Sequence, residues 1–229
     1  SLFKEREKRQ KPRLDDKIFT SWNGLMLKGF VDAYKAFQNP KHLEIALKNA
    51  SFIVDKQIRK DGGLYRNFKN DKSTINAYSE DYATVIDAFI ALYQVTLDEK
   101  WLLHSKQLMD YLIEHFLNKE NDLFYFTSNL DDVLISKKTD IVDAAIPSSN
   151  SMIANSLFQL CHYFSEEKYN KQSKKMLSTI IKDVKNAPLG YSNWLHLLMN
   201  YSDSYYEVAI SGSNATKNIN EINKKYIPN

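Results

Sequence analysis

The sequence predicts an all-α protein built from helical hairpins, and three observations lead to this class. Glycine and proline are scarce, at six and five of 229 residues, whereas β-sandwiches, barrels and doubly wound folds use many tight turns. Long stretches carry apolar residues at helical spacing. Hydrophobic residues make up 43% and charged residues 26% of the chain, which is typical of globular proteins with a substantial core.

Apolar periodicity and helix breakers place the elements in order. We expect helices over residues 2–11, 19–37, 43–58, 79–97, 101–116, 146–164, 169–184, 192–201 and 216–226. We expect short strands over residues 64–68, 122–127 and 205–210. Pro12 ends the first helix, and acidic residues at Asp15 and Asp16 suit the start of the next one.

Polar residues open four of the expected helices. The openings are Ser21-Trp22-Asn23-Gly24, Ser79-Glu80-Asp81-Tyr82, Ser148-Ser149-Asn150-Ser151 and Ser192-Asn193-Trp194. Their spacing is too irregular for a short-period solenoid but fits stacked hairpins with variable loops. Hairpins that curve produce an (α/α) toroid whose inner helices point their N-termini toward one face. We therefore expect the openings to converge on a shallow cavity, where backbone N–H groups favour anions and hydroxyl ligands.

Composition excludes several functional classes. The net charge of +3 is too small for a nucleic-acid footprint, and no apolar stretch approaches the ~20 residues of a membrane span. The single cysteine, Cys161, excludes an internal disulfide framework and a cysteine zinc cluster. The charged first residues lack a signal-peptide core, so we expect a cytoplasmic location. No metal-ligand spacing or glycine-rich phosphate loop is present, and we predict no metal and no cofactor.

Four segments together resemble a known family: residues 9–26 (RQKPRLDDKIFTSWNGLM), 79–83, 143–151 and 207–212. They are similar to the helical part of the thioredoxin-domain-containing family that includes spermatogenesis-associated protein 20 and its bacterial relatives. The resemblance implies an (α/α) barrel like those of N-acylglucosamine 2-epimerases and six-hairpin glycosidases. In that family an N-terminal thioredoxin-like domain accompanies the barrel and is the implied partner.

This sequence departs from the family pattern in two ways. Ser149 stands where the family usually has glycine. The thioredoxin-like domain and the first part of the barrel are absent. We therefore expect residues 1–229 to form a single helical barrel fragment, a partial ring with short β connectors.

Five carboxylates are candidate catalytic groups: Asp15, Asp16, Glu80, Asp81 and Asp143. Acid–base chemistry on sugars needs carboxyl groups with perturbed pKa values inside a cavity. Each of these carboxylates also has a structural interpretation, because acids at a helix start cap it and complement its dipole.

Six further residues are candidate substrate contacts: Trp22, Asn23, Arg66, Tyr82, Ser148 and Asn150. Aromatic rings can stack on a sugar, and amide, hydroxyl and guanidinium groups can bind its hydroxyls. The structural interpretations are that Trp22 lies in the core, Ser148 caps a helix and Arg66 is solvated. Gly24 and Gly29 lie inside a helix, and we expect both to face helix packing.

Our first functional hypothesis is sugar binding, or epimerase- or glycosidase-like acid–base sugar chemistry, at the inner-helix N-termini. Among the histidines only His196 follows a polar opening, which counts against the paired histidines of the related 2-epimerases. The alternative is a non-catalytic binding or scaffold module that acts with a thioredoxin-like domain. A barrel without any ligand is a third possibility.

Overall fold

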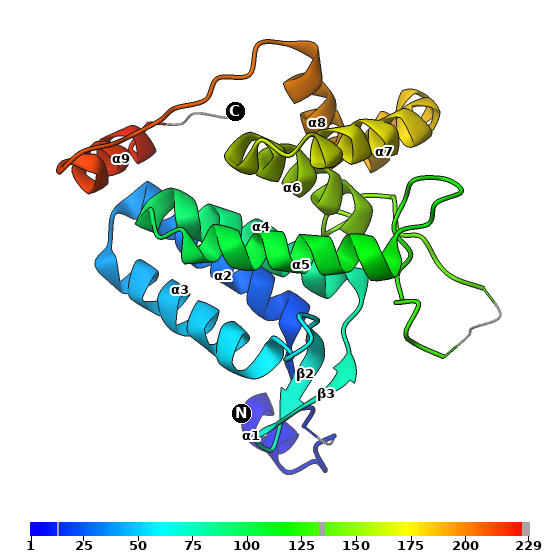
Figure 1. Cartoon of the computed structure of the whole chain (residues 1–229). Coiled ribbons are helices and arrows are strands. Elements are labelled where there is room, and N and C mark those ends of the chain that lie inside the picture. Colours follow the sequence, from blue (N-terminus) through cyan, green and yellow to red (C-terminus); the bar gives the residue numbers. More distant parts are fainter. Residues whose placement is uncertain (13, 133–135, 226–229) are drawn as a thin grey trace.

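A computed structural model describes residues 1–12, 14–132 and 136–225, and most of them are helical (Figure 1). The α-helices are α1 (Leu2–Glu7), α2 (Thr20–Phe37), α3 (Pro40–Phe52), α4 (Ser79–Thr96), α5 (Lys100–Phe116), α6 (Ser149–Phe164), α7 (Glu167–Asn186), α8 (Ser192–Ser202) and α9 (Ala215–Asn223). A π-helical turn, η1 (Ile53–Gln57), continues α3, and a 3₁₀ turn, η2 (Pro188–Gly190), precedes α8.

The helices form two layers of consecutive hairpins. The pairs α2–α3, α4–α5 and α6–α7 lie side by side in chain order (Figure 1), and α8 adds a further helix beside α6. Helices α2, α4, α6 and α8 contact one another in succession as an inner layer, with α3, α5 and α7 outside them. Helix α4 is apolar on nearly every side because it packs against α2, α5 and α6. The prediction of stacked helical hairpins is confirmed.

Local chemistry explains several helix starts. Asn39 accepts a hydrogen bond from the Lys41 N–H, and Pro40 occupies the first turn of α3. Ser148 caps α6 in the same way, by accepting from the Ser151 N–H at 3.2 Å, as predicted. At the start of α4, Tyr78 holds the cap position.

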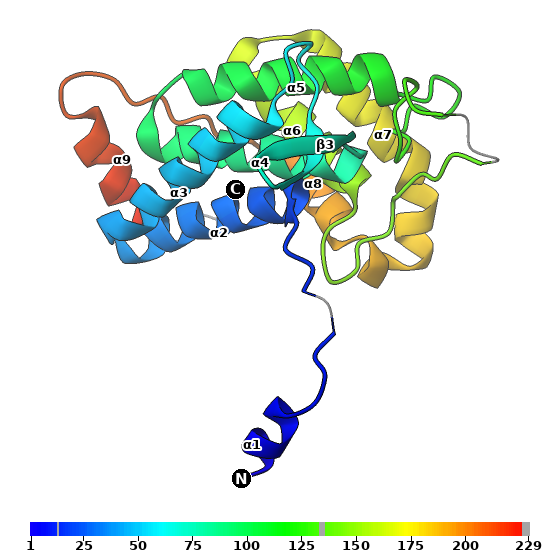
Figure 2. The ribbon, with the colours of Figure 1, turned by 90° about the horizontal axis from the view of Figure 1, so that it is seen from below.

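The expected helix start around Asp15 and Asp16 is wrong. Both residues lie in an exposed segment before β1 (Ile18–Phe19), and α2 begins only at Thr20. The acids therefore neither cap α2 nor complement its dipole. Helix α1 ends at Glu7, four residues earlier than expected. It buries none of its residues and projects away from the helical layers (Figure 2).

A small antiparallel sheet connects the second hairpin to the start of α2. Strand β2 (Tyr65–Lys69) pairs with both β1 and β3 (Lys72–Asn76), with Phe19 opposite Asn67 and Asn67 opposite Thr74. Asn70 and Asp71 both have positive φ, as a two-residue hairpin turn requires. The sequence predicts β2 alone, because β3 is polar and largely exposed.

Two other expected strands are not formed. Residues 122–127 contribute only isolated bridges, Leu117 to Phe124 and Tyr125 to Thr139. Residues 205–210 are extended but pair with no strand in the described part of the chain. They belong to the connection between α8 and α9, residues 203–214, here named the strap. The last expected helix is α9, which ends at Asn223; Tyr226 lies outside the described residues.

The two helical glycines of α2 differ in their surroundings. A Cβ atom on Gly24 would lie 2.8 Å from the Thr84 backbone carbon, so α2 and α4 approach closely there. A Cβ on Gly29 would meet nothing within 4 Å among the described residues, so the expectation of packing is wrong at Gly29. No helix in the described ranges combines the length and the apolar character that crossing a membrane requires.

Candidate functional site

The polar openings of the four inner helices lie together at one end of the layer. The Ser21 N–H at the start of α2 donates to Asp81 Oδ1 of α4 at 2.9 Å. The Ser79 hydroxyl of α4 donates to Ser149 Oγ of α6 at 3.1 Å. The Asn193 N–H of α8 donates to Asp143 Oδ2, next to α6, at 2.8 Å. These contacts form a continuous rim, here named the N-terminal rim.

Asp81 is the most enclosed carboxylate of the N-terminal rim, with no exposed surface. Its Oδ2 accepts from the Tyr78 N–H at 2.9 Å and from Arg66 Nη1 at 3.1 Å, in addition to the bond from Ser21 to Oδ1. Burial raises the pKa of Asp81 to about 6, against the opposing effects of the Tyr78 hydrogen bond and the Arg66 charge. Asp81 holds three elements together and presents no surface to a ligand.

Arg66 joins the small sheet to the start of α4. The same Nη1 atom that contacts Asp81 donates to Glu80 Oε1 at 2.8 Å. The guanidinium lies 4.3 Å from the centre of the Tyr78 ring and 5.6 Å from that of Phe19. Arg66 is therefore an ion-pairing and stacking residue and not merely solvated. Glu80 is the partly exposed carboxylate of this pair, at 37% of its side chain.

Asp143 has three donors of its own. Its Oδ1 accepts from the Ser148 N–H at 2.9 Å and from the Ser151 hydroxyl at 2.7 Å, while Oδ2 accepts from Asn193. The side chain is nearly buried. Asp143 therefore fixes the start of α6 and ties it to α8.

Two candidate substrate contacts are part of the interior. Asn150 is fully buried; its Oδ1 accepts from the Phe124 N–H at 2.7 Å, and its Nδ2 donates to the Phe124 and Asp140 carbonyls at 2.9 Å. Tyr82 is fully buried, stacks on Tyr111 and accepts from the Leu64 N–H at 2.8 Å. Protein groups already engage the polar atoms of both residues, and their role as substrate contacts stays a prediction.

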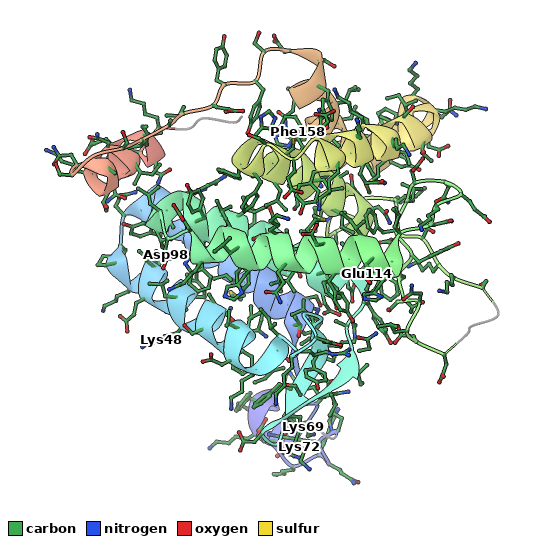
Figure 3. All side chains as sticks on the ribbon, in the orientation of Figure 1. Lys48, Lys69, Lys72, Asp98, Glu114 and Phe158 are labelled. Carbon is green, nitrogen blue, oxygen red and sulfur yellow. The ribbon has the colours of Figure 1, made fainter. Side chains whose placement is uncertain are left out.

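The candidates around the start of α2 lie on the surface. Asp15 pairs with Lys17 at 3.2 Å, and Asp16 pairs with Lys69 on the β2–β3 hairpin (Figure 3). Trp22 is 67% exposed, so the core interpretation of Trp22 is wrong. Asn23 donates to the Phe19 carbonyl at 2.8 Å.

A cavity of about 490 Å³ lies between the inner helices. This inner cavity is lined by Lys28, Lys35, Asp87, Gln94, Pro147, Met152, Asn155, Gln159, Asn193, His196, Asn200 and Tyr205. None of the eleven residues that we selected from the sequence belongs to that lining. The polar openings converge as expected, and the inner cavity reaches the starts of α6 and α8 at Pro147 and Asn193, but the rest of its lining lies farther along the inner helices.

Spacing could have revealed the inner cavity. Its polar residues recur seven positions apart on the inner helices, as in Lys28 and Lys35 or Asn193 and Asn200, and this spacing puts them on one face. Asp87 is the clearest signal, because it is a lone charge within the apolar stretch of α4. Of these residues, the polar helix openings include Asn193 and leave out Lys28, Lys35, Asp87 and Asn200.

Charged groups in the inner cavity influence each other. Burial raises the pKa of Asp87, although Lys28 opposes the shift. Burial disfavours the charge of Lys28, but Asp87 and Asp32 outweigh it and leave the pKa of Lys28 above its ordinary value. Burial lowers the pKa of Lys35. The inner cavity thus contains a carboxyl group, Asp87, and a lysine, Lys28, whose pKa values both lie above their ordinary values.

Amide groups complete the lining. Asn155 Nδ2 donates to the Ser151 and Asn193 carbonyls at 2.9 and 3.0 Å, so its position is fixed. Asn200 Oδ1 is buried and accepts no hydrogen bond from any described residue. An acceptor of this kind beside a cavity suits a ligand hydroxyl. Within the described ranges, no group of three or more His, Cys, Asp and Glu side chains is placed to hold a metal ion.

The chain shares sequence with longer proteins, although no family model matches it. It is 23% identical to human spermatogenesis-associated protein 20 over 242 residues, covering 100% of this chain and 31% of that protein. The chain is homologous to spermatogenesis-associated protein 20. An uncharacterized Caenorhabditis elegans protein is 27% identical over 82% of this chain and 26% of its own length. The chain thus spans about a quarter to a third of these relatives.

Solved structures share the fold. A GH76 α-mannanase of Bacteroides thetaiotaomicron matches with a TM-score of 0.60 and 21% identity, over 75% of this chain and 46% of that one. Cellobiose 2-epimerase of Bacillus thermoamylovorans matches at 0.59 and 14%, over 72% and 44%. A D-mannose isomerase matches at 0.57 and 17%, over 77% and 43%. The (α/α) toroid prediction is confirmed, and the neighbours are sugar epimerases, isomerases and glycosidases.

Proposed function

We propose that the inner cavity binds a saccharide. The observation that supports this most directly is the mixture of amide, lysine and carboxyl groups in a cavity of about 490 Å³, which matches the dense donors and acceptors of a sugar. The neighbours' fold adds support by analogy alone. One of them, an inactive α-1,6-mannanase variant of Salegentibacter with two consecutive aspartates changed to asparagine, holds α-1,6-mannotriose.

Asn200 provides the sharpest test of sugar binding. Its Oδ1 accepts no hydrogen bond in the described protein. Asn200→Leu therefore removes an acceptor for the ligand without breaking a hydrogen bond of the protein at that atom. We expect D-mannose, cellobiose or α-1,6-mannotriose at tenfold its Kd to raise the thermal midpoint by about 3–5 °C. The Asn200→Leu variant loses that shift, while Leu103→Ala on the outer surface of α5 keeps it. A folded wild type that none of the three sugars stabilises would contradict the proposal.

The chemistry that we propose is proton exchange rather than hydrolysis. Glycosidases generally use two carboxylates, and Asp87 supplies the carboxylate in the described lining of the inner cavity. Its raised pKa and the nearby Lys28 suit a group that takes a proton and returns it. His196, in the same lining, is a second proton carrier.

Deuterium incorporation tests this chemistry. In D₂O, removal of the proton next to a sugar carbonyl and its return from solvent places deuterium on that carbon. We expect the wild type to incorporate deuterium at the carbon next to the carbonyl of D-mannose or cellobiose. The Asp87→Asn variant should incorporate it at least tenfold more slowly. Glu80→Gln removes a carboxylate that the sequence predicts to be catalytic. Its labelling rate, measured in the same way, tests that prediction. Equal labelling by wild type and Asp87→Asn would count against proton exchange at Asp87.

One observation favours the alternative, a module that contacts another domain. Trp22, Met26 and Phe37 are 67%, 57% and 75% exposed, and their spacing places them on one side of α2. A contiguous apolar face of this kind is typical of a binding surface. The thioredoxin-like domain implied by the family resemblance is the partner to test. We expect Phe37→Ser to weaken calorimetric binding of that domain without lowering the thermal midpoint.

A further inference from the structure

A second cavity lies at the other end of the inner helices. It has a volume of about 390 Å³ and is bounded by the ends of α4 and α6, by the strap and by Ile219 of α9. Its walls include Tyr93, Gln94, Gln159, Tyr163, Tyr205 and Tyr206. This strap cavity is rich in tyrosine rings, whereas the inner cavity contains the lysines and Asp87.

The two cavities adjoin each other. Gln94, Gln159 and Tyr205 line both of them. Lys35 Nζ donates to Gln94 Oε1 at 3.0 Å, and Gln94 Nε2 donates to Gln159 Oε1 at 3.4 Å and to the Tyr163 hydroxyl at 3.2 Å. The partition therefore includes polar side chains that can exchange these bonds for bonds to ligand hydroxyls.

The strap is anchored beside the strap cavity. The Tyr205 ring packs on Phe158 of α6, with 4.8 Å between ring centres (Figure 3 labels Phe158), and on His162 at 4.7 Å. Glu207 pairs with His162. Tyr206, the next residue, leaves 80% of its surface exposed. An exposed ring on an anchored segment provides a flat face on which a sugar ring can stack.

We propose that the ligand is an oligosaccharide of at least two rings. One ring occupies the inner cavity, where it meets the charged and amide groups, and the next ring crosses the Gln94–Gln159 contact to lie against the tyrosines of the strap cavity. The inference rests on the proposed sugar binding and narrows its substrate class.

The test compares ligands of different length on matched variants. D-mannose, cellobiose and α-1,6-mannotriose are titrated calorimetrically into the wild type, Tyr206→Ala, Asn200→Leu and Leu103→Ala. We expect cellobiose or mannotriose to bind at least tenfold more tightly than mannose. Tyr206→Ala should weaken the longer sugar about two- to tenfold and leave mannose unchanged. Asn200→Leu should weaken all ligands that bind, and Leu103→Ala none.

The outcomes separate the two proposals. If mannose binds the wild type as tightly as the longer sugars, or if Tyr206→Ala leaves their affinity unchanged, the inner cavity still binds sugar but the two-ring inference is wrong. If no sugar binds the folded wild type, the proposed function itself fails. Because Tyr206 is largely exposed, its replacement should keep the thermal midpoint of the wild type, and that midpoint is measured first.

Discussion

At the scale of single residues, two glycines of α2 predict opposite results for one substitution. Gly24→Ala places a methyl group 2.8 Å from the Thr84 backbone, and we expect a net loss of about 1–3 kcal/mol in unfolding free energy. Gly29→Ala meets open space and should add about 0.5–1 kcal/mol through helix propensity. Urea denaturation measures both. Equal effects of the two substitutions would show that the close approach at Thr84 has no energetic consequence.

Asp81 makes stability depend on pH in the direction opposite to most aspartates. Its pKa rises from 3.8 to about 6 because of burial, so the folded state holds this proton more tightly than the unfolded state. Raising the pH through this window therefore removes up to about 3 kcal/mol of stability, which is fully present only below the unfolded pKa. The Asp81→Asn variant has no carboxyl group at this position, so its stability should not show this loss as the pH rises.

The measurement is urea unfolding of wild type and Asp81→Asn at several values between pH 4 and pH 7. At pH 4 the variant should be the less stable by about 1–3 kcal/mol, because an asparagine cannot accept from both the Ser21 and the Tyr78 N–H groups. The difference should shrink as the pH rises. A difference that stays constant across the range would contradict a raised pKa at Asp81.

The polar openings could be predicted residue by residue, but their roles could not. The sequence shows that Asp81, Asp143 and Asn150 lie at helix starts; it does not show that neighbouring backbone N–H groups and carbonyls use their polar atoms. Those partners come from up to 60 residues away, as in the bond between Ser21 and Asp81. A free carboxylate such as Asp87 and a bound one such as Asp143 look alike without the tertiary contacts.

At the scale of elements, Asp143 is the joint between α6 and α8. Asp143→Ala leaves the Ser148 N–H, the Ser151 hydroxyl and the Asn193 N–H without this acceptor, and we expect a loss of about 2–4 kcal/mol. The control is Lys175→Ala, which removes a surface pair with Asp122 and should cost less than about 1 kcal/mol. Chemical denaturation measures the unfolding free energy of both variants. Similar losses would show that Asp143 stabilises the contact between α6 and α8 no more than a surface ion pair would.

Helices could be predicted from periodicity, whereas of the strands only β2 could. The inner helices bury broad apolar stripes, so their spacing is plain in the sequence. Strand β3 is exposed and polar, and it forms because the Asn70–Asp71 turn brings it to β2. Residues 205–210 have the β-branched and aromatic content of a strand. They find no partner strand in the described chain, because pairing depends on a neighbour that local pattern does not reveal.

At the scale of the whole molecule, the three hairpins and α8 pack side by side in chain order. The matched neighbours are about twice as long as the region they share with this chain. Helix α2 exposes Trp22 and Phe37, whereas α4, which packs against α2, α5 and α6, exposes almost nothing. The low glycine content predicts this helical architecture well, because the turns within the hairpins α2–α3, α4–α5 and α6–α7 are short.

Truncation tests which parts of the molecule support the fold. Helix α9 buries no residue, and the strap is mostly exposed, so a chain that ends at Asp203 should lose less than about 2 kcal/mol of unfolding free energy. A chain that ends at Gly190 also loses Trp194 and Leu197 of α8, both fully buried. Removing those side chains from the core costs about 3–5 kcal/mol for the tryptophan alone, and the Asp143 joint is lost as well. We expect cooperative thermal unfolding for the first truncation and its disappearance for the second; equal midpoints would mean that α8 is not part of the folded core.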